Sequence, residues 1–152
     1  MPRHSETRDV PYTAEEMYAL VADVERYPAF LPWTAAARVR SREAHGATEV
    51  LLADLVISFK VFRESFGSRV TLHPDERRIE TAYVDGPFRH LQSEWRFTDR
   101  PEGGCRVEFW VDFAFRNPIL GRVIGVVFDE AMQRVVAAFE KRAAALYGAR
   151  RR

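Results

Sequence analysis

Residues 117–148 read NPILGRVIGVVFDEAMQRVVAAFEKRAAALYG, and this stretch determines the expected fold. Asn117 can cap a helix, Pro118 suits its first position, and Gly148 suits its end. The residues between Pro118 and Gly148 contain no proline, and they could form a helix about 40 Å long at about 1.5 Å per residue. Apolar residues form a stripe along it: Ile119, Val123, Val127, Met132, Val135, Phe139, Ala143 and Leu146. Such a stripe indicates that the helix lies along another apolar surface.

The preceding residues, from about Arg38 to Phe115, show the alternation and short turns that are typical of an antiparallel sheet. Three apolar sets are expected on its inner face: Val107, Phe109, Val111, Phe113 and Phe115; Phe62, Phe66, Val70 and Leu72; and Leu91, Trp95 and Phe97. This face is the surface that the long helix requires. Residues 3–10 are too polar to be predicted as a strand.

A shorter helix is expected near the start of the chain. Thr13 and Glu16 have the spacing of a capping box, which predicts a helix over about 14–22 with Met17, Leu20 and Val21 on one face. No repeat or linker divides the sequence, so we expect one α+β domain over residues 1–148, followed by a solvated basic tail over 149–152.

The composition narrows the classes of function. The 11 Phe, 5 Tyr and 3 Trp are more than a core of this size usually needs, which fits either a lined cavity or an aromatic-rich core. The net charge of +1 argues against DNA binding. The single cysteine, Cys105, excludes an internal disulfide and suits a reducing compartment. With no apolar leader and no apolar run of about 20 residues, a soluble, cytoplasmic protein is expected.

Several distinctive segments are spread in order over nearly the whole chain: VPYTAEEMY (10–18), LVADVERYP (20–28), Phe30-Leu31-Pro32-Trp33, DGPF (85–88), WRF (95–97), AFEKRA (138–143) and LYG (146–148). Together they resemble the START-like coenzyme Q-binding family, which also includes ribosome-association toxins. Where the family often has a cysteine, after the Leu-Pro-Trp segment, this chain has Thr34. The resemblance implies a helix-grip (START/Bet v 1-like) fold, in which a curved antiparallel sheet wraps around the long C-terminal helix.

The resemblance also implies that the chain binds ubiquinone or a related isoprenoid lipid in support of respiratory electron transfer, without turnover, so the protein is expected not to be an enzyme. No cofactor other than this ligand is implied. The candidate ligand-binding residues are Phe30, Leu31, Pro32, Trp33, Leu55, Phe62, Phe66, Phe88, Leu91, Trp95, Phe113, Val123, Val127 and Met132. Each of them also fits ordinary core packing.

Polar residues add little to this interpretation. His4, His45, His73 and His90 lack metal-ligand spacing, and His45 and His73 are expected to face water. Glu64, Gln92, Glu94 and Arg96 lie in the expected sheet, where alternation places most of them outward. Gly121 and Gly125 leave room either for a ligand or for a close approach of helix and sheet.

Two other functions stay open. The first is a ribosome-associated regulator that contacts a ribosomal subunit, for which Arg38, Arg40 and Arg42 could supply charge, although a solvated strand face is the favoured explanation of these arginines. The second is a polyketide aromatase or cyclase, which requires an acid–base set that these residues do not supply. Phe30, Leu31 and Trp33 either form an apolar gate that touches the inner face of a membrane transiently, or fold back onto the core.

Overall fold

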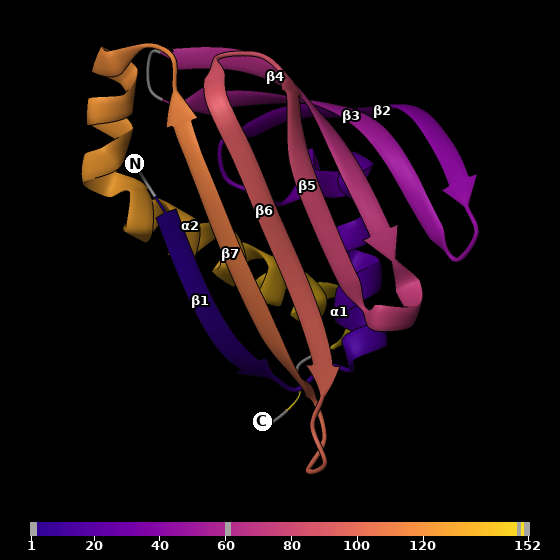
Figure 1. Ribbon diagram of the computed structural model, residues 1–152. Helices are drawn as coiled ribbons and strands as arrows, with labels where there is room; N and C mark the ends of the chain where they lie inside the picture. Colours follow the sequence, from indigo (N-terminus) through magenta and orange to yellow (C-terminus); the bar gives the residue numbers. More distant parts are fainter. Residues whose placement is uncertain (1–2, 60–61, 149, 151–152) are drawn as a thin grey trace.

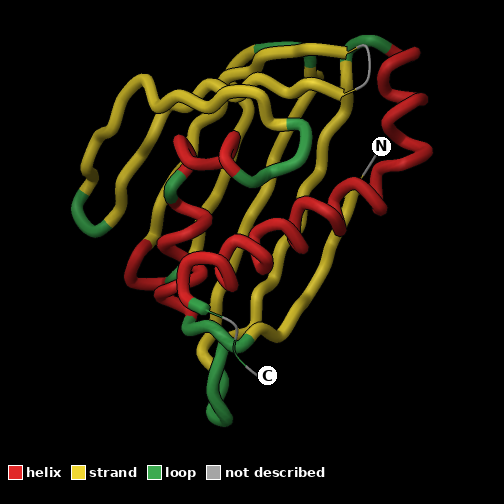
Figure 2. Tube along the Cα trace, turned by 180° about the vertical axis from the view of Figure 1, so that it is seen from behind, coloured by secondary structure: helices red, strands yellow, loops and turns green. Residues whose placement is uncertain are grey.

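The computed structural model describes residues 3–59, 62–148 and 150, except for the side chains of Phe59 and Phe62. Its strands form one curved antiparallel sheet in the order β1-β7-β6-β5-β4-β3-β2, and the long helix α2 crosses the concave face (Figures 1 and 2). The elements are β1 (Arg3–Val10), α1 (Ala14–Ala22), η1 (Val24–Ala29), β2 (Thr34–His45), β3 (Thr48–Phe59), β4 (Phe62–His73), η2 (Pro74–Glu76), β5 (Arg78–Asp85), β6 (Phe88–Asp99), β7 (Cys105–Phe115) and α2 (Pro118–Tyr147). The predicted α+β helix-grip architecture is confirmed.

Both predicted helices begin where their capping residues place them. The Thr13 hydroxyl accepts a hydrogen bond from the Glu16 amide at 3.1 Å, and the Thr13 amide donates to the Glu16 carboxylate at 2.9 Å. At the start of α2, Oδ1 of Asn117 accepts a hydrogen bond from the Ile119 amide at 2.9 Å. These side chains satisfy amides that have no partner within the helix itself.

The predicted stripe of α2 is only partly correct. Val127, Met132, Val135, Phe139 and Ala143 are buried or half-buried, as expected. Ile119, Val123 and Leu146, by contrast, are 68%, 38% and 51% exposed.

In the first turns of α2 the face toward the sheet carries Leu120 and Phe128 instead. Almost every residue there is apolar, so a spacing pattern fits both sides of the helix equally well. Among the described residues, no helix is long and apolar enough to cross a membrane.

The expectation for residues 3–10 was wrong, because they form β1, an edge strand paired antiparallel with β7. Polar side chains are usual on an edge strand, whose outer side meets water. Two of its side chains, His4 and Val10, are nevertheless buried. Nδ1 of His4 lies 3.1 Å from Oδ1 of Asp129 on α2, so the strand also anchors the helix.

The basic tail is not simply solvated at Arg150. Its guanidinium forms two hydrogen bonds to the Glu16 carboxylate, at 2.6 and 2.9 Å, and lies 5.1 Å from the ring centre of Tyr12. This residue is therefore bound to the domain, contrary to the prediction. The other tail residues, 149, 151 and 152, lie outside the described part of the chain.

Candidate functional site

A cavity of about 290 Å³ lies between the concave face of the sheet and α2. Small-molecule pockets span about 300–1,000 Å³, so this volume lies just below the lower end of that range. Eleven of the predicted ligand-binding residues line it: Leu31, Pro32, Trp33, Leu55, Phe66, Phe88, Leu91, Trp95, Phe113, Val127 and Met132. The structure thus brings residues from the 31–34 segment, five strands and α2 to one space.

Three predicted residues are not part of this lining. Phe30 packs edge-on against Phe139, with ring centres 5.3 Å apart, and lies beneath the Arg142 guanidinium. Val123 lies on the exposed side of α2, where the helix surface turned toward solvent is itself apolar. The side chain of Phe62 falls outside the described residues.

Two aromatic clusters form part of the cavity wall. In the first, the ring of Phe88 stacks on Phe115 at 4.7 Å and meets Phe113 edge-on at 5.5 Å. In the second, Trp95 stacks on Phe109 at 4.3 Å and meets Phe139 edge-on at 5.1 Å. Each such aromatic pair contributes about 0.5–1.5 kcal/mol beyond the burial of its surface, so the two clusters stabilise the wall.

The proline-bearing segment that was singled out from the sequence forms part of the cavity wall, and its Leu31, Pro32 and Trp33 are half-buried. Trp33 has a φ of 61°, which is the left-handed region, and its carbonyl accepts a hydrogen bond from the Ser58 amide at 2.8 Å. A bulky residue in this region is strained by about 1–3 kcal/mol and persists only where its surroundings impose the conformation. The hydrogen bond to β3 therefore helps to hold Leu31, Pro32 and Trp33 against the cavity.

Several lining residues were not among the predicted ones: Tyr27, Thr34, Ile57, Thr81, Ser93, Phe109, Val111, Phe115, Ile124, Phe128, Ala131, Val135 and Phe139. Strand alternation was the available signal for most of them, since Ser93 lies between the inward-facing Leu91 and Trp95. Tyr27, in the 3-10 helix η1, and Thr34, the first residue of β2, gave no such signal.

The polar lining offers little chemistry. Tyr27 is the only titratable residue among the described residues around the cavity, and its hydroxyl donates to the carbonyl of Val21. Burial raises the pKa of Tyr27, so the phenol stays protonated near neutral pH. A general acid and a general base therefore do not face each other in the described lining.

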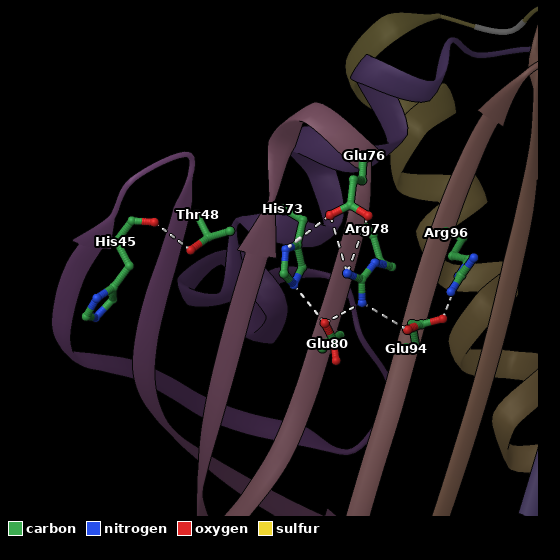
Figure 3. Close-up of polar contacts among 8 residues, drawn as sticks. All are labelled: His45, Thr48, His73, Glu76, Arg78, Glu80, Glu94 and Arg96. Atoms are coloured by element: carbon green, nitrogen blue, oxygen red, sulfur yellow. Dashed lines mark hydrogen bonds and ion pairs between the residues drawn. The ribbon is translucent and has the colours of Figure 1, made fainter.

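Charged residues of the central strands lie on the opposite, convex face. Figure 3 shows Glu94 between Arg78 and Arg96, at 3.3 and 2.6 Å, and His73 beside Glu80 at 2.7 Å. Glu94 and Arg96 thus point away from the cavity, as alternation predicted. The expectation that His73 faces water was wrong, because its ring is largely covered and held by carboxylates.

Gly121 and Gly125 play neither of the two expected roles. A Cβ added at Gly125 would meet nothing within 4 Å, and one at Gly121 would meet only the Phe115 Cβ at 4.0 Å. Neither position lies in the cavity lining. No close approach of helix and sheet therefore requires these glycines.

Comparison with known proteins places this geometry in a family. Residues 10–140 match the family described as polyketide cyclase / dehydrase and lipid transport. The chain is 38% identical to the ribosome association toxin RatA of Escherichia coli K12, over 99% of this chain and 92% of that protein. It is 33% identical to the mitochondrial coenzyme Q-binding protein COQ10 homolog B of Xenopus laevis, over 95% of this chain and 59% of that protein.

A solved structure agrees with this placement. The 18 kDa protein CC1736 of Caulobacter crescentus superposes with a TM-score of 0.82 at 36% identity, over 98% of this chain and 100% of that one. The matched segments cover both the strands and the helix that enclose the cavity. The chain belongs to the polyketide cyclase / dehydrase and lipid transport family, and it is similar to proteins named as coenzyme Q-binding proteins and as ribosome association toxins.

Proposed function

We propose that the chain binds an isoprenoid lipid, specifically ubiquinone, in the cavity between the sheet and α2, in support of respiratory electron transfer. The observation that carries the proposal is the nearly continuous apolar lining of a space of about 290 Å³. Burial of an apolar chain contributes about 0.8 kcal/mol per CH₂ group. The name of the coenzyme Q-binding relative supports a quinone as the ligand.

The cavity does not hold a whole long-chain quinone. Since a water molecule has a share of about 30 Å³ in the liquid, the space corresponds to roughly ten water molecules. A quinone ring and the first part of its tail occupy that volume, and the remaining tail leaves between Leu31, Trp33 and Ile124 at the rim.

Binding without conversion is part of the proposal. A polyketide aromatase or cyclase needs groups that exchange protons with its substrate, and the described lining offers only the protonated phenol of Tyr27. The names of the two relatives above describe a binding protein and a toxin, which supports a non-catalytic role.

The direct test is to purify the protein from its native host, extract it with organic solvent and identify the extract by mass spectrometry. We expect an isoprenoid quinone in stoichiometric amount, and saturable binding when the emptied protein is titrated with ubiquinone. An extract without any isoprenoid, together with no binding in the titration, would refute the proposal.

We further propose that ligand exchange takes place at the inner face of a membrane, through the first turns of α2. Ile119 and Val126 there are 68% and 83% exposed, whereas Ile124 and Val127 on the same turns of the helix line the cavity. A helix segment that is apolar on both sides is normally covered on both. The only charged residue between Asn117 and Phe128 is Arg122, which suits an anionic lipid surface.

Flotation with lipid vesicles tests this surface. Binding is expected to vesicles of phosphatidylcholine mixed with phosphatidylglycerol, and Val126→Gln should weaken it by up to about tenfold, as expected for the loss of one inserted apolar side chain. Leu146→Gln is the matched control, because Leu146 is an exposed apolar residue at the other end of the same helix. Equal vesicle binding by both variants and the wild type would contradict the proposed contact.

A second candidate function is association with a ribosomal subunit, which the name of the RatA relative favours. The three arginines of β2 give it limited support, since Arg40 pairs with Asp54 at 2.9 Å and Arg42 pairs with Glu49 at 3.5 Å. Sedimentation with ribosomal subunits at moderate salt is the test. A contact that depends on a few surface charges should dissociate as salt rises, whereas a specific complex should persist.

A further inference from the structure

Three hydroxyl side chains lie on the concave face of the sheet, and two of them line the cavity. They are Ser68 on β4, Thr81 on β5 and Ser93 on β6. Thr81 and Ser93 are direct cross-strand partners and both line the cavity. Ser68 is buried outside this lining, opposite Tyr83, which is two residues from Thr81 on β5. Because side chains directly opposite each other on one face of a sheet lie about 4.5–5.5 Å apart, Thr81 and Ser93 form a polar patch, with Ser68 at the longer diagonal spacing.

The deepest of the three hydroxyls has no hydrogen-bond partner among the described residues. Oγ of Ser68 is buried without a partner, since the residue is only 1% exposed, whereas Thr81 and Ser93 are half-buried. A buried hydroxyl without a partner is destabilising. Elsewhere the fold provides partners: the Tyr12 hydroxyl donates to the Gly148 carbonyl at 2.9 Å, and the Tyr83 hydroxyl accepts from the Phe88 amide at 3.1 Å.

The same residues account for the open space. Along β6, Ser93 is flanked on the inner face by Leu91 and Trp95, and along β4, Ser68 is flanked by Phe66 and Val70. Small side chains between large ones leave a hollow in the floor where larger apolar residues would fill the core. The hollow is therefore polar at its base and apolar around its sides.

We propose that Thr81 and Ser93, with Ser68 behind them, form a hydrogen-bonding subsite for an oxygen atom at the ring end of the ligand, such as a quinone carbonyl. This inference rests on the proposed function and specifies the orientation of the ligand. A hydroxyl can donate to a quinone carbonyl and can accept from the hydroquinone that forms on reduction, so the subsite accommodates both forms. The ring lies in the floor between Phe88 and Trp95, and the tail points to the rim at Trp33.

The test compares two probes in matched variants. Ubiquinone with two isoprene units carries ring oxygens, and the isoprenoid hydrocarbon farnesene carries none. Thr81→Val and Ser93→Ala remove one hydroxyl each with little change in shape. Thr71→Val is the control, because Thr71 lies on β4 on the opposite, convex face. Ubiquinone binding is measured by quenching of tryptophan fluorescence, since Trp33 and Trp95 line the cavity, and farnesene binding by competition.

We expect Thr81→Val and Ser93→Ala each to weaken ubiquinone binding by about 3- to 10-fold, the usual effect of one lost hydrogen bond. Farnesene binding should be unchanged or tighter, and Thr71→Val should alter neither ligand. In infrared spectra, the carbonyl band of the bound quinone should lie below its position in a dry hydrocarbon solvent and should rise in both variants.

The possible failures are distinguishable. If the wild-type protein does not bind ubiquinone, the proposed function is refuted. If the wild type binds ubiquinone and both variants bind it with the same affinity, the subsite alone is refuted. The subsite is also refuted if the affinity of the variants for farnesene falls as much as their affinity for ubiquinone. The wild-type infrared spectrum gives an answer that does not depend on the folding of any variant, because a carbonyl band at its dry-solvent position would exclude the hydrogen bond.

Discussion

A larger side chain on α2 that fills the cavity should weaken ligand binding without lowering the stability of the fold. Ala131 lines the space of about 290 Å³ from the helix side, and we consider Ala131→Phe. A cavity of about 150 Å³ accepts a benzene ring, so the added phenyl group would take roughly half of the volume. It would bury apolar surface in space that already exists, which should leave stability unchanged or raise it by up to about 2 kcal/mol. For a chain of this size, each kcal/mol raises Tm by about 2–4 °C.

The same substitution should displace the ligand. Loss of contact for only two CH₂ groups already weakens binding by about tenfold, and half of the cavity accommodates more than that. Thermal unfolding and ubiquinone titration measure the two effects, with Ala137→Phe as the control, because Ala137 is exposed on the same helix. In a solidly packed core, the extra ring would instead cost about 1–3 kcal/mol. Destabilisation by Ala131→Phe with undiminished ubiquinone binding would refute the reasoning.

Three further predictions concern the rest of the fold. Gly125→Ala should raise the free energy of unfolding by about 0.5–1 kcal/mol, because the new Cβ meets nothing within 4 Å and alanine favours a helix. Denaturant titrations measure this change, and a loss of stability would contradict the open surroundings of Gly125. The hydrogen bond from Arg150 holds the pKa of Glu16 below its usual range, so its stabilisation is present above the unfolded-state pKa of about 4.3 and is lost as pH falls through the folded value. Glu16→Gln should flatten the decline of Tm at acid pH, and an unaltered profile would argue against the pair. Burial raises the pKa of the Cys105 thiol to about 12. A disulfide reagent at pH 8 should therefore modify this thiol only when the protein unfolds, and rapid labelling of the native protein would contradict its burial.

The parts of the fold that depend on neighbouring residues were predictable. The capping box of Thr13 and Glu16 and the Asn117 cap place the starts of α1 and α2 through hydrogen bonds that span at most three residues. Alternation likewise placed the apolar side of β7 on the inner face, because that pattern follows from the strand itself.

The parts that depend on distant residues were not predictable in the same way. β1 is a strand because β7, about a hundred residues later in the chain, pairs with it, and nothing in its polar sequence reveals that partner. The orientation of the first turns of α2 is set by contact with the sheet, since the helix there is apolar on both sides.

The candidate site shows both cases. Its apolar walls were largely predictable, because the inward-facing apolar residues that would form a core also line a ligand cavity. The hydroxyl patch was overlooked because Ser68 and Ser93 interrupt apolar sets at positions that alternation nonetheless places inward. An interruption by a small polar residue at an inward position is thus a signal that can be sought in other sequences of this kind.

Three unusual local features lie on elements that enclose the cavity. Trp33, which lines the cavity, has a left-handed backbone, the Ser68 hydroxyl is buried without a partner on β4, and Val126 is 83% exposed on α2. The backbone of Trp33 and the buried hydroxyl of Ser68 each lower stability, and exposed apolar surface is typical of interaction sites. Such features are expected at functional sites, whereas the caps, the aromatic clusters and the β1–α2 contact agree with the fold. The proposed binding and exchange of a ligand would account for all three, whereas ordinary core packing would have to explain each one separately.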